Sequence, residues 1–295
     1  MKTEQEQTAD GGRNPVLGVQ MMMLKDQVAE QGMWAVLKRL AALDLHAVEI
    51  SQIPMNAANT ADLERGIAEL GMQVAALSTA LTRRPGQDID TLAEDFDKLV
   101  ADCRRLNCRF ARIPMMDFSA MVSKEAVEAW ARRLSPYALR LREAGVTLCY
   151  HNHHVDLHRF GEERIFDIVR RVAPELEFEV DLHWVQRGGM APLDMLAAYS
   201  GVCKLIHVKD YRVTALPQEA LELMDAGKVT EGYNMFVNII EFAEVGSGNM
   251  NWPALLPAAA SAGAEYFLIE QDLTYGRDPF DCLADSRAYL RSIGY

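Results

Sequence analysis

Residues 147–156 have the sequence TLCYHNHHVD. An apolar, strand-like run over 146–150 opens directly into His-Asn-His-His, and a carboxylate follows two residues later. Three of the chain's seven histidines therefore lie within four residues, at the C-terminal end of a predicted buried strand. In a parallel α/β barrel, the C-terminal ends of the strands carry the chemistry. A polar surface loop could have the same composition, so the rest of the chain has to distinguish the two.

The bulk composition limits the class of protein. The chain has 295 residues, of which 49% are hydrophobic and 24% charged, a size that suits one barrel domain or two smaller domains. A net charge of −12 disfavours nucleic acid and anionic membranes as partners, because both attract basic surfaces. No uncharged apolar run approaches the length of a membrane span. We therefore predict a soluble cytoplasmic protein that binds neither nucleic acid nor membrane.

The N-terminal segment 1–14 differs from the rest of the chain. It is polar and has no apolar core of a signal peptide, so we predict a disordered leader ahead of a folded domain over 15–295. The five cysteines are odd in number, scattered and without a CxxC pair. A disulfide framework or a Cys-rich zinc site is therefore not expected.

Apolar runs and helical periodicities alternate along the chain. Strands are predicted at 16–24, 47–50, 72–78, 109–114, 146–153, 176–183, 202–209 and 266–271. Helices are predicted at 25–43, 60–70, 88–106, 123–144, 162–172, 193–200, 252–262 and 279–293. Eight such units predict a single-domain (β/α)8 TIM barrel. An open dinucleotide-binding sheet would carry GxGxxG after its first strand, which this chain lacks.

Residues 211–244, between strands seven and eight, exceed a minimal connection. The segment contains a helix-like piece at 218–226 and an apolar stretch at 235–242. Loops of this length in compact domains usually serve as lids, binding segments or subunit contacts. We expect a lid or a subunit contact, with an insertion of no function as the alternative.

Lone polar residues stand inside the apolar runs of strands six to eight. Strand alternation puts Asp181 and His183 on one face, and likewise His207 and Lys209, while Glu270 follows directly after apolar residues. Burying such groups without partners is costly. His207 alone could be a satisfied core residue, but successive strands that deliver carboxylates and an imidazole to one end suit a divalent ion.

Seven motifs, in order and spacing together, resemble the xylose isomerase-like barrels, also called the sugar phosphate isomerase/epimerase superfamily. They are GVQMMMLKDQ (18–27), HAVEIS (46–51), YHNHHVD (150–156), EVDLHW (179–184), IHVKDY (206–211), EVGSGNMNW (244–252) and LIEQD (268–272). The resemblance covers nearly all of residues 16–295. It implies one catalytic divalent metal, Mn²⁺ first and Mg²⁺, Co²⁺ or Zn²⁺ as alternatives, held from strands five to eight.

The ligand set implied by the resemblance fits this chain at three positions, Asp181, His207 and Glu270. At the fifth strand the chain departs from the epimerases, which have a Glu where this chain has His151. A subgroup with the pattern His-Asn-His-x-x-Glu is more similar, and its Glu corresponds to Asp156. Asp156 is therefore the predicted ligand and His151 the predicted base, with His151 as ligand left open.

Other site residues are assigned more loosely. His153 is expected to orient the substrate or to support a metal ligand from behind, and His183 to contact a substrate hydroxyl. Trp184 is expected to form an apolar wall, with a core role as its alternative. Glu49 is grouped with the substrate contacts. Lys209 is expected to stabilise an enolate oxygen or to pair with Glu49, and an ordinary salt bridge is its alternative.

The resemblance predicts a sugar isomerase/epimerase that abstracts a proton next to the carbonyl of a sugar or ketosugar through a metal-bound enediolate, with Glu270 and Lys209 also in catalytic roles. The alternative is a lyase acting by β-elimination, as in inosose dehydratases and the metal-binding subunit of 3-keto-C-glycoside deglycosidases. A non-catalytic sugar-binding barrel is a further alternative. An endonuclease IV-like enzyme would need a basic groove for DNA, which the net charge of −12 disfavours. A homo-oligomer is expected, or a hetero-oligomer with a small subunit.

Overall fold

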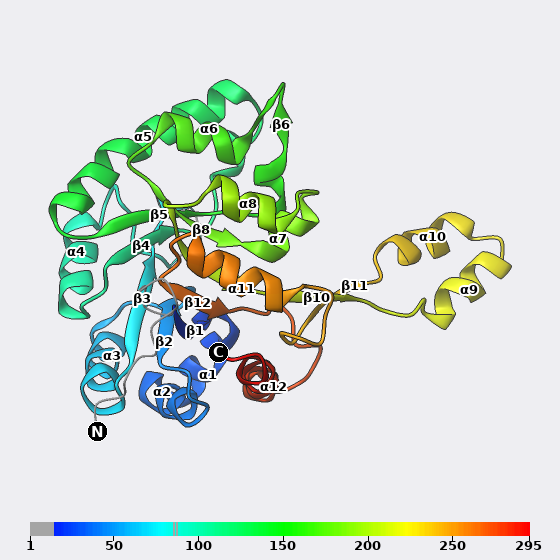
Figure 1. The fold of residues 1–295 in the computed structure, drawn as a ribbon, viewed down its shortest axis with the longest axis horizontal. Coiled ribbons are helices and arrows are strands. Elements are labelled where there is room, and N and C mark those ends of the chain that lie inside the picture. Colours follow the sequence, from blue (N-terminus) through cyan, green and yellow to red (C-terminus); the bar gives the residue numbers. More distant parts are fainter. Residues whose placement is uncertain (1–14, 85, 87) are drawn as a thin grey trace.

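Apolar strands close into a barrel in the computed structural model, which describes residues 15–84, 86 and 88–295 (Figure 1). All eight strands are parallel, and their order around the barrel is β1-β12-β9-β8-β5-β4-β3-β2. They are β1 Val16–Gln20, β2 Ala47–Ile50, β3 Gln73–Ser78, β4 Phe110–Ile113, β5 Thr147–His151, β8 Glu177–Asp181, β9 Cys203–Val208 and β12 Tyr266–Ile269. The predicted TIM barrel is confirmed; the predicted leader, 1–14, lies outside the described residues.

Helices connect the strands and cover the outside of the barrel (Figure 1). They are α1 Lys25–Gln31, α2 Met33–Ala42, α3 Ala57–Leu70, α4 Phe96–Arg105, α5 Lys124–Glu143, α6 Ile165–Val172, α7 Leu182–Arg187, α8 Pro192–Ala198, α11 Trp252–Ser261 and α12 Pro279–Ser292. Three 3₁₀ helices follow β1, β4 and β5: η1 Met21–Leu24, η2 Phe118–Ala120 and η3 His154–Leu157. Among the described residues, no helix is long and apolar enough to cross a bilayer.

Two predicted helices have different bounds in the structure. The helix expected over 25–43 is broken at Gly32, whose φ of +82° favours glycine. The helix expected from residue 88 begins only at Phe96, because Thr91 bridges to Ala80 and donates its backbone N–H to Asp95. Local side-chain hydrogen bonds of this kind compete with helix formation and do not alter the hydrophobic period.

The insertion forms an arm, defined here as residues 210–243. Its root is an antiparallel ribbon of β10 Asp210–Val213 and β11 Ile240–Ala243. Its tip is a pair of helices, α9 Gln218–Asp225 and α10 Val229–Val237, that projects away from the barrel (Figure 1). A second, smaller hairpin, β6 Arg159–Phe160 with β7 Glu163–Arg164, precedes α6.

The carboxylate of Asp210 fixes the root of the arm. It is fully buried and accepts hydrogen bonds from the backbone N–H groups of Tyr211, Gly246 and Met250 at 2.8–3.1 Å. The indole N–H of Trp252 donates a further bond at 2.8 Å. The loop after β11 therefore folds around one buried charge.

Replacing this charge should destabilise the whole domain. In Asp210→Ala the buried donors around the carboxylate lose their acceptor, so we expect a loss of about 3–5 kcal/mol in the free energy of unfolding. Urea unfolding followed by circular dichroism measures the difference. Glu222→Ala, at an exposed position of α9, is the matched control and should change stability by less than about 0.5 kcal/mol. Equal losses in the two variants would contradict the anchoring role.

Candidate metal centre

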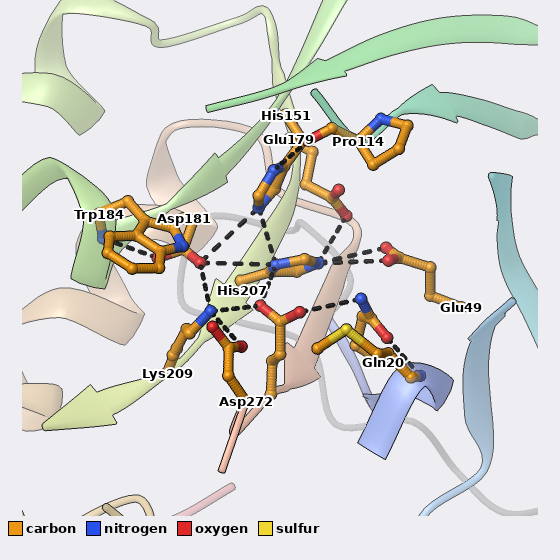
Figure 2. A network of polar contacts seen from close by, with 12 residues as sticks. Gln20, Glu49, Pro114, His151, Glu179, Asp181, Trp184, His207, Lys209 and Asp272 are labelled. Atoms are coloured by element: carbon orange, nitrogen blue, oxygen red, sulfur yellow. Dashed lines mark hydrogen bonds and ion pairs between the residues drawn. The ribbon is translucent and has the colours of Figure 1, made fainter. Parts of the chain in front are cut away.

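Four side chains from four neighbouring strands meet at the C-terminal end of the barrel (Figure 2). His151 ends β5, Asp181 ends β8, His207 lies in β9 and Glu270 follows β12 directly. One ligand-type atom from each lies within 4.8 Å of all the others, and all four residues are buried. His207 Nδ1 is 2.9 Å from Glu270 Oε2 and 3.0 Å from His151 Nε2. We call these residues the four-residue cluster.

Strand register brings the cluster to one height in the barrel. Asp181 is paired with His207, and Val208 is paired with Ile269, the residue before Glu270. The side chain of Asn152, directly after β5, hydrogen-bonds to both the backbone N–H and the carbonyl of Asp181. The end of β5 is thus tied to the end of β8.

Both imidazoles point a ring nitrogen into the cluster. Burial would lower the pKa of His207, but the carboxylates of Glu179, Glu270 and Glu49 raise it well above its usual range. His151 Nδ1 is 3.0 Å from the carbonyl oxygen of Pro114, so this nitrogen carries the proton and donates it. His207 Nε2 lies 3.2 Å from Glu179 and 3.4 Å from Glu49, which engage its outer nitrogen in the same way. Histidines that bind metals typically donate their other N–H to a carbonyl or carboxylate. The two inner nitrogens, His151 Nε2 and His207 Nδ1, are thereby oriented as ligands.

A second group of buried charges adjoins the cluster, and Figure 2 shows two of them, Glu49 and Glu179, near the ring of His207. Arg112 Nε is 2.6 Å from Glu49 and 3.2 Å from Glu179, and all three side chains are at most 2% exposed. Burial and the neighbouring Glu49 raise the pKa of Glu179. This group supports His207 and neutralises part of the buried acid.

The sequence contained a signal for Arg112 and Glu179 that the prediction did not use. Arg112 is the one charged residue of FARI (110–113), and Glu179 stands between two apolar residues in FEVD (178–181). Glu49, predicted to contact substrate, belongs to this group and is not among the residues that line the cavity. Its partners are Arg112 and His207, so the predicted pairing of Glu49 with Lys209 is replaced by other contacts.

Lys209 lies beside the cluster and contacts three carboxylates. Its Nζ is 3.1 Å from Glu270, 3.7 Å from Asp181 and 2.6 Å from Asp272. Burial would lower the pKa of Lys209, but these carboxylates raise it, so the ammonium stays charged. Burial would raise the pKa of Asp181 and of Glu270, but Lys209 above all lowers both well below the usual range.

The donor set fits a divalent cation. Asp181 Oδ2 is buried and has no hydrogen-bond donor in the described part of the chain, although it faces His151, His207 and Lys209 at 3.7 Å. Two carboxylates and two oriented imidazole nitrogens are ligands that Mn²⁺, Co²⁺ and Zn²⁺ accept. A cation between them would satisfy the orphaned oxygen.

A cavity of about 880 Å³ opens onto the cluster. His151, His153, Lys209, Glu270 and Asp272 line it from the catalytic side. Segments after β1 to β4 line the rest, with apolar, basic and acidic residues that include Met22, Ile53, Met55, Arg84, Asp88, Asp90, Lys98 and Met115. A cavity of this size accommodates a small organic molecule.

The sequence from 37 to 293 matches the model of the xylose isomerase-like TIM barrel. The chain belongs to this family. The match confirms the resemblance inferred from the motifs. No curated protein sequence matches the chain.

Solved structures of the same fold include a sugar phosphate isomerase/epimerase from Parabacteroides distasonis ATCC 8503, at 16% identity and a TM-score of 0.67, covering 99% of this chain and 98% of that one. An L-ribulose 3-epimerase has 13% identity and a TM-score of 0.66, with 95% and 94% covered. A probable 3-DHS dehydratase of petrobactin synthesis from Bacillus anthracis has 12% identity and a TM-score of 0.66, with 94% and 98% covered. These identities show a common fold.

Asp156, predicted as the fifth-strand ligand, lies apart from the four-residue cluster of this xylose isomerase-like barrel. The chain turns into η3 directly after His153, and Asp156 caps that turn. Its carboxylate accepts one bond from the Tyr150 hydroxyl and another from the His153 backbone N–H, at 2.5 and 2.8 Å. His151, the alternative ligand, occupies the corresponding place in the cluster.

His183 and Trp184 occupy the first turn of a helix rather than the end of a strand. Asp181 ends β8 and accepts a hydrogen bond from the Trp184 backbone N–H, which starts α7 and ends the alternation assumed for His183. His183 is fully buried against Trp184, Tyr211 and Phe242 and is not among the cavity-lining residues. Trp184 packs its ring 4.8 Å from the Lys209 ammonium and, like His183, is not among the cavity-lining residues, so its predicted role as an apolar wall stays a prediction.

His153 lies where a substrate contact was predicted. It lines the cavity, and its Nδ1 has no hydrogen-bond partner in the described part of the chain. Burial lowers the pKa of His153 to about 2, so the imidazole is neutral at physiological pH. A neutral ring can donate to or accept from a hydroxyl group.

The ionisation of Asp156 should appear in the pH dependence of stability. Burial raises the pKa of Asp156 from 3.8 to about 6. The unfolded chain ionises this group at lower pH than the folded chain, so the charge destabilises the fold by about 3 kcal/mol above pH 6 and by nothing below pH 4. Asp156→Asn should therefore gain up to about 3 kcal/mol relative to the wild type as pH rises from 4 to 7.

Urea unfolding at a series of pH values measures this difference. Asp225→Asn, at an exposed position at the end of α9, is the matched control and should give a profile parallel to that of the wild type. A parallel profile for Asp156→Asn as well would show that this carboxylate ionises freely in the folded protein.

Proposed function

We propose that this protein is a divalent-metal-dependent enzyme of the isomerase/epimerase type that moves a proton next to the carbonyl of a sugar or ketosugar. The observation that carries the proposal is the convergence of His151, Asp181, His207 and Glu270 on one point at the base of a cavity. The family, and neighbours of the same fold that are named as an isomerase/epimerase, an epimerase and a dehydratase, support this reaction class.

The four-residue cluster would hold the ion, with His151 in the place first assigned to Asp156. This choice is supported by the His151 hydrogen bond to Pro114, which leaves Nε2 free to coordinate. A bound divalent ion would polarise a substrate carbonyl and acidify the neighbouring C–H. As a ligand, His151 has no free nitrogen left to act as the base.

Proton transfer then belongs to Glu270 and Lys209. Glu270 lines the cavity as a carboxylate, and the Gln20 amide holds its Oε1 at 2.9 Å. It can accept a proton from the substrate carbon and return it. Lys209 remains protonated and can donate to the oxygen on which negative charge develops. His153, neutral and facing the cavity, orients a substrate hydroxyl.

A β-elimination on a keto-sugar is the second candidate. Among the four ligands only His151 and Glu270 line the cavity, so the cluster presents one carboxylate to the substrate rather than two on opposite faces. Lys209 and Asp272, 2.6 Å apart at the cavity wall, could supply the proton that a departing group requires. Elimination needs a proton acceptor and a donor but no second carboxylate among the ligands.

Metal content separates the two ligand assignments. Purified protein loaded with Mn²⁺ and dialysed should retain about one ion per chain, measured by elemental analysis. Asp181→Asn and His151→Ala should lose most of it, because each removes a ligand. Asp156→Asn should retain the ion, because this carboxylate caps η3 and lies outside the cluster. Retention in His151→Ala with loss in Asp156→Asn would reverse the assignment.

Solvent exchange tests the chemistry. In deuterated water, the metal-loaded protein should introduce deuterium next to the carbonyl of a ketosugar substrate, or release a β-substituent, and NMR distinguishes the two. Lys209→Met should slow either reaction by about 10²–10³-fold with little change in metal content, since Lys209 acts on developing charge. Lys38→Met, on the exposed face of α2, is the control. Full metal occupancy without either reaction across a ketosugar panel would favour a binding barrel.

A further inference from the structure

Two aromatic rings contact the ammonium of Lys209 in addition to its three carboxylates. Lys209 Nζ lies over both rings, 4.8 Å from the centre of Trp184 and 5.2 Å from the centre of Phe242. The lysine is 1% exposed, so rings and carboxylates take the place of water around the charge. The negative face of an aromatic ring attracts an ammonium, and the attraction is stronger where water is excluded.

The two rings come from different parts of the fold. Trp184 lies in the first turn of α7, directly after β8, so its ring belongs to the barrel. Phe242 lies in β11, at the root of the arm. The ring centres are 6.1 Å apart and the ring planes are inclined at 80° to each other. The arm therefore supplies part of the immediate surroundings of Lys209, a residue of β9's C-terminal end.

His183 holds the two rings against each other. Its ring centre is 4.7 Å from that of Trp184 and 5.2 Å from that of Phe242, and the side chain is fully buried. It also packs 5.1 Å from the ring of Tyr211, the residue paired with Phe242 across the ribbon. This packing joins α7 to the root of the arm and gives His183 a structural place behind the site.

The backbone of Phe242 is held by the loop that follows β12. Its N–H donates a hydrogen bond to the Tyr275 hydroxyl at 3.0 Å. The same loop carries Asp272, whose carboxylate is 2.6 Å from Lys209 Nζ. The loop therefore acts on the lysine in two ways, directly through Asp272 and indirectly through Tyr275 and Phe242.

The rings act on the cavity only through Lys209. Lys209 lines the cavity, whereas neither Trp184 nor Phe242 is among the described residues that do so. Lysine carries its charge on a flexible four-carbon chain, and carboxylates at 2.6–3.7 Å draw the ammonium in several directions. A ring face attracts the ammonium without accepting its proton. The rings can therefore restrict the position of the charge and leave its proton available.

We propose that Phe242 is a positioning residue for Lys209, through which the arm completes the site at the end of the barrel. The inference rests on the proposed function, in which the Lys209 ammonium donates to the oxygen on which negative charge develops. Phe242 contacts Lys209 from outside the cavity, so its removal should displace the ammonium without removing a substrate contact. The proposal therefore predicts a loss in kcat rather than in substrate binding.

The kinetics of three variants test this prediction. Phe242→Leu keeps apolar area but removes the ring face, so kcat for exchange or elimination should fall by about 10-fold at unchanged KM and metal content. Phe242→Tyr keeps the ring and should restore most of the rate. Phe236→Leu, the same substitution at an exposed ring of α10 on the same arm, is the matched control and should react like the wild type.

Two kinetic outcomes would overturn the proposal. One is a wild-type kcat in Phe242→Leu. The other is an equally slow Phe242→Tyr, because a requirement for the packing of phenylalanine itself, rather than for a ring face, would then explain the loss.

A spectroscopic measurement separates this inference from the proposed function. In protein labelled with ¹³C-lysine, the side-chain protons of Lys209 should resonate upfield of those of a solvated lysine, because they lie over two ring faces. Lys209→Met assigns the signal, Phe242→Leu should move it downfield, and Phe236→Leu should leave it in place. An unshifted signal in an active wild type would overturn the inference alone. A shifted signal in a wild type that catalyses neither reaction would refute the proposed function, and this inference with it.

Discussion

The burial of Arg112 between Glu49 and Glu179 is the interaction on which the rest of the site depends. An unpaired guanidinium inside a barrel would be strongly destabilising, and so would two unpaired carboxylates. Together they form a satisfied layer that reaches His207 Nε2 and fixes the direction of its ring. The upper layer of the barrel can therefore concentrate acidic and imidazole groups at one point without unfolding the strands that carry them.

Much of the fold and part of the site could be predicted from residue pattern. The order of strands and helices follows from the spacing of hydrophobic residues, and this spacing can be recognised in a single sequence. Asp181, His207 and Glu270 were found because a lone polar residue in an apolar strand has to have a partner. Arg112 and Glu179 carried the same signal, but they lie below the strand ends where ligands were sought.

The rest of the site depends on where the backbone turns, which the pattern does not contain. The Asp181 side chain accepts a hydrogen bond from the Trp184 backbone N–H, which ends β8 and starts α7, and His183 lies away from the cavity as a result. A similar local cap removed Asp156 from the cluster and left His151 there. In both places a turn replaces the strand alternation within two or three residues. Hydrophobic periodicity needs a longer stretch of sequence and does not reveal such a turn.

The loop whose backbone N–H groups bind the buried carboxylate of Asp210 lies between the arm and the barrel. Gly248 is part of it, since a Cβ at that position would lie 2.2 Å from Asp210 Oδ1. The two strands of the ribbon between this loop and the tip pair with each other, and the ribbon also forms hydrogen bonds to Asn249 and Tyr275. Everything beyond the ribbon can therefore be lengthened, shortened or exchanged while the barrel keeps its own strand pairing. The root of the arm is therefore a position at which this barrel can acquire a new binding segment next to its candidate metal centre.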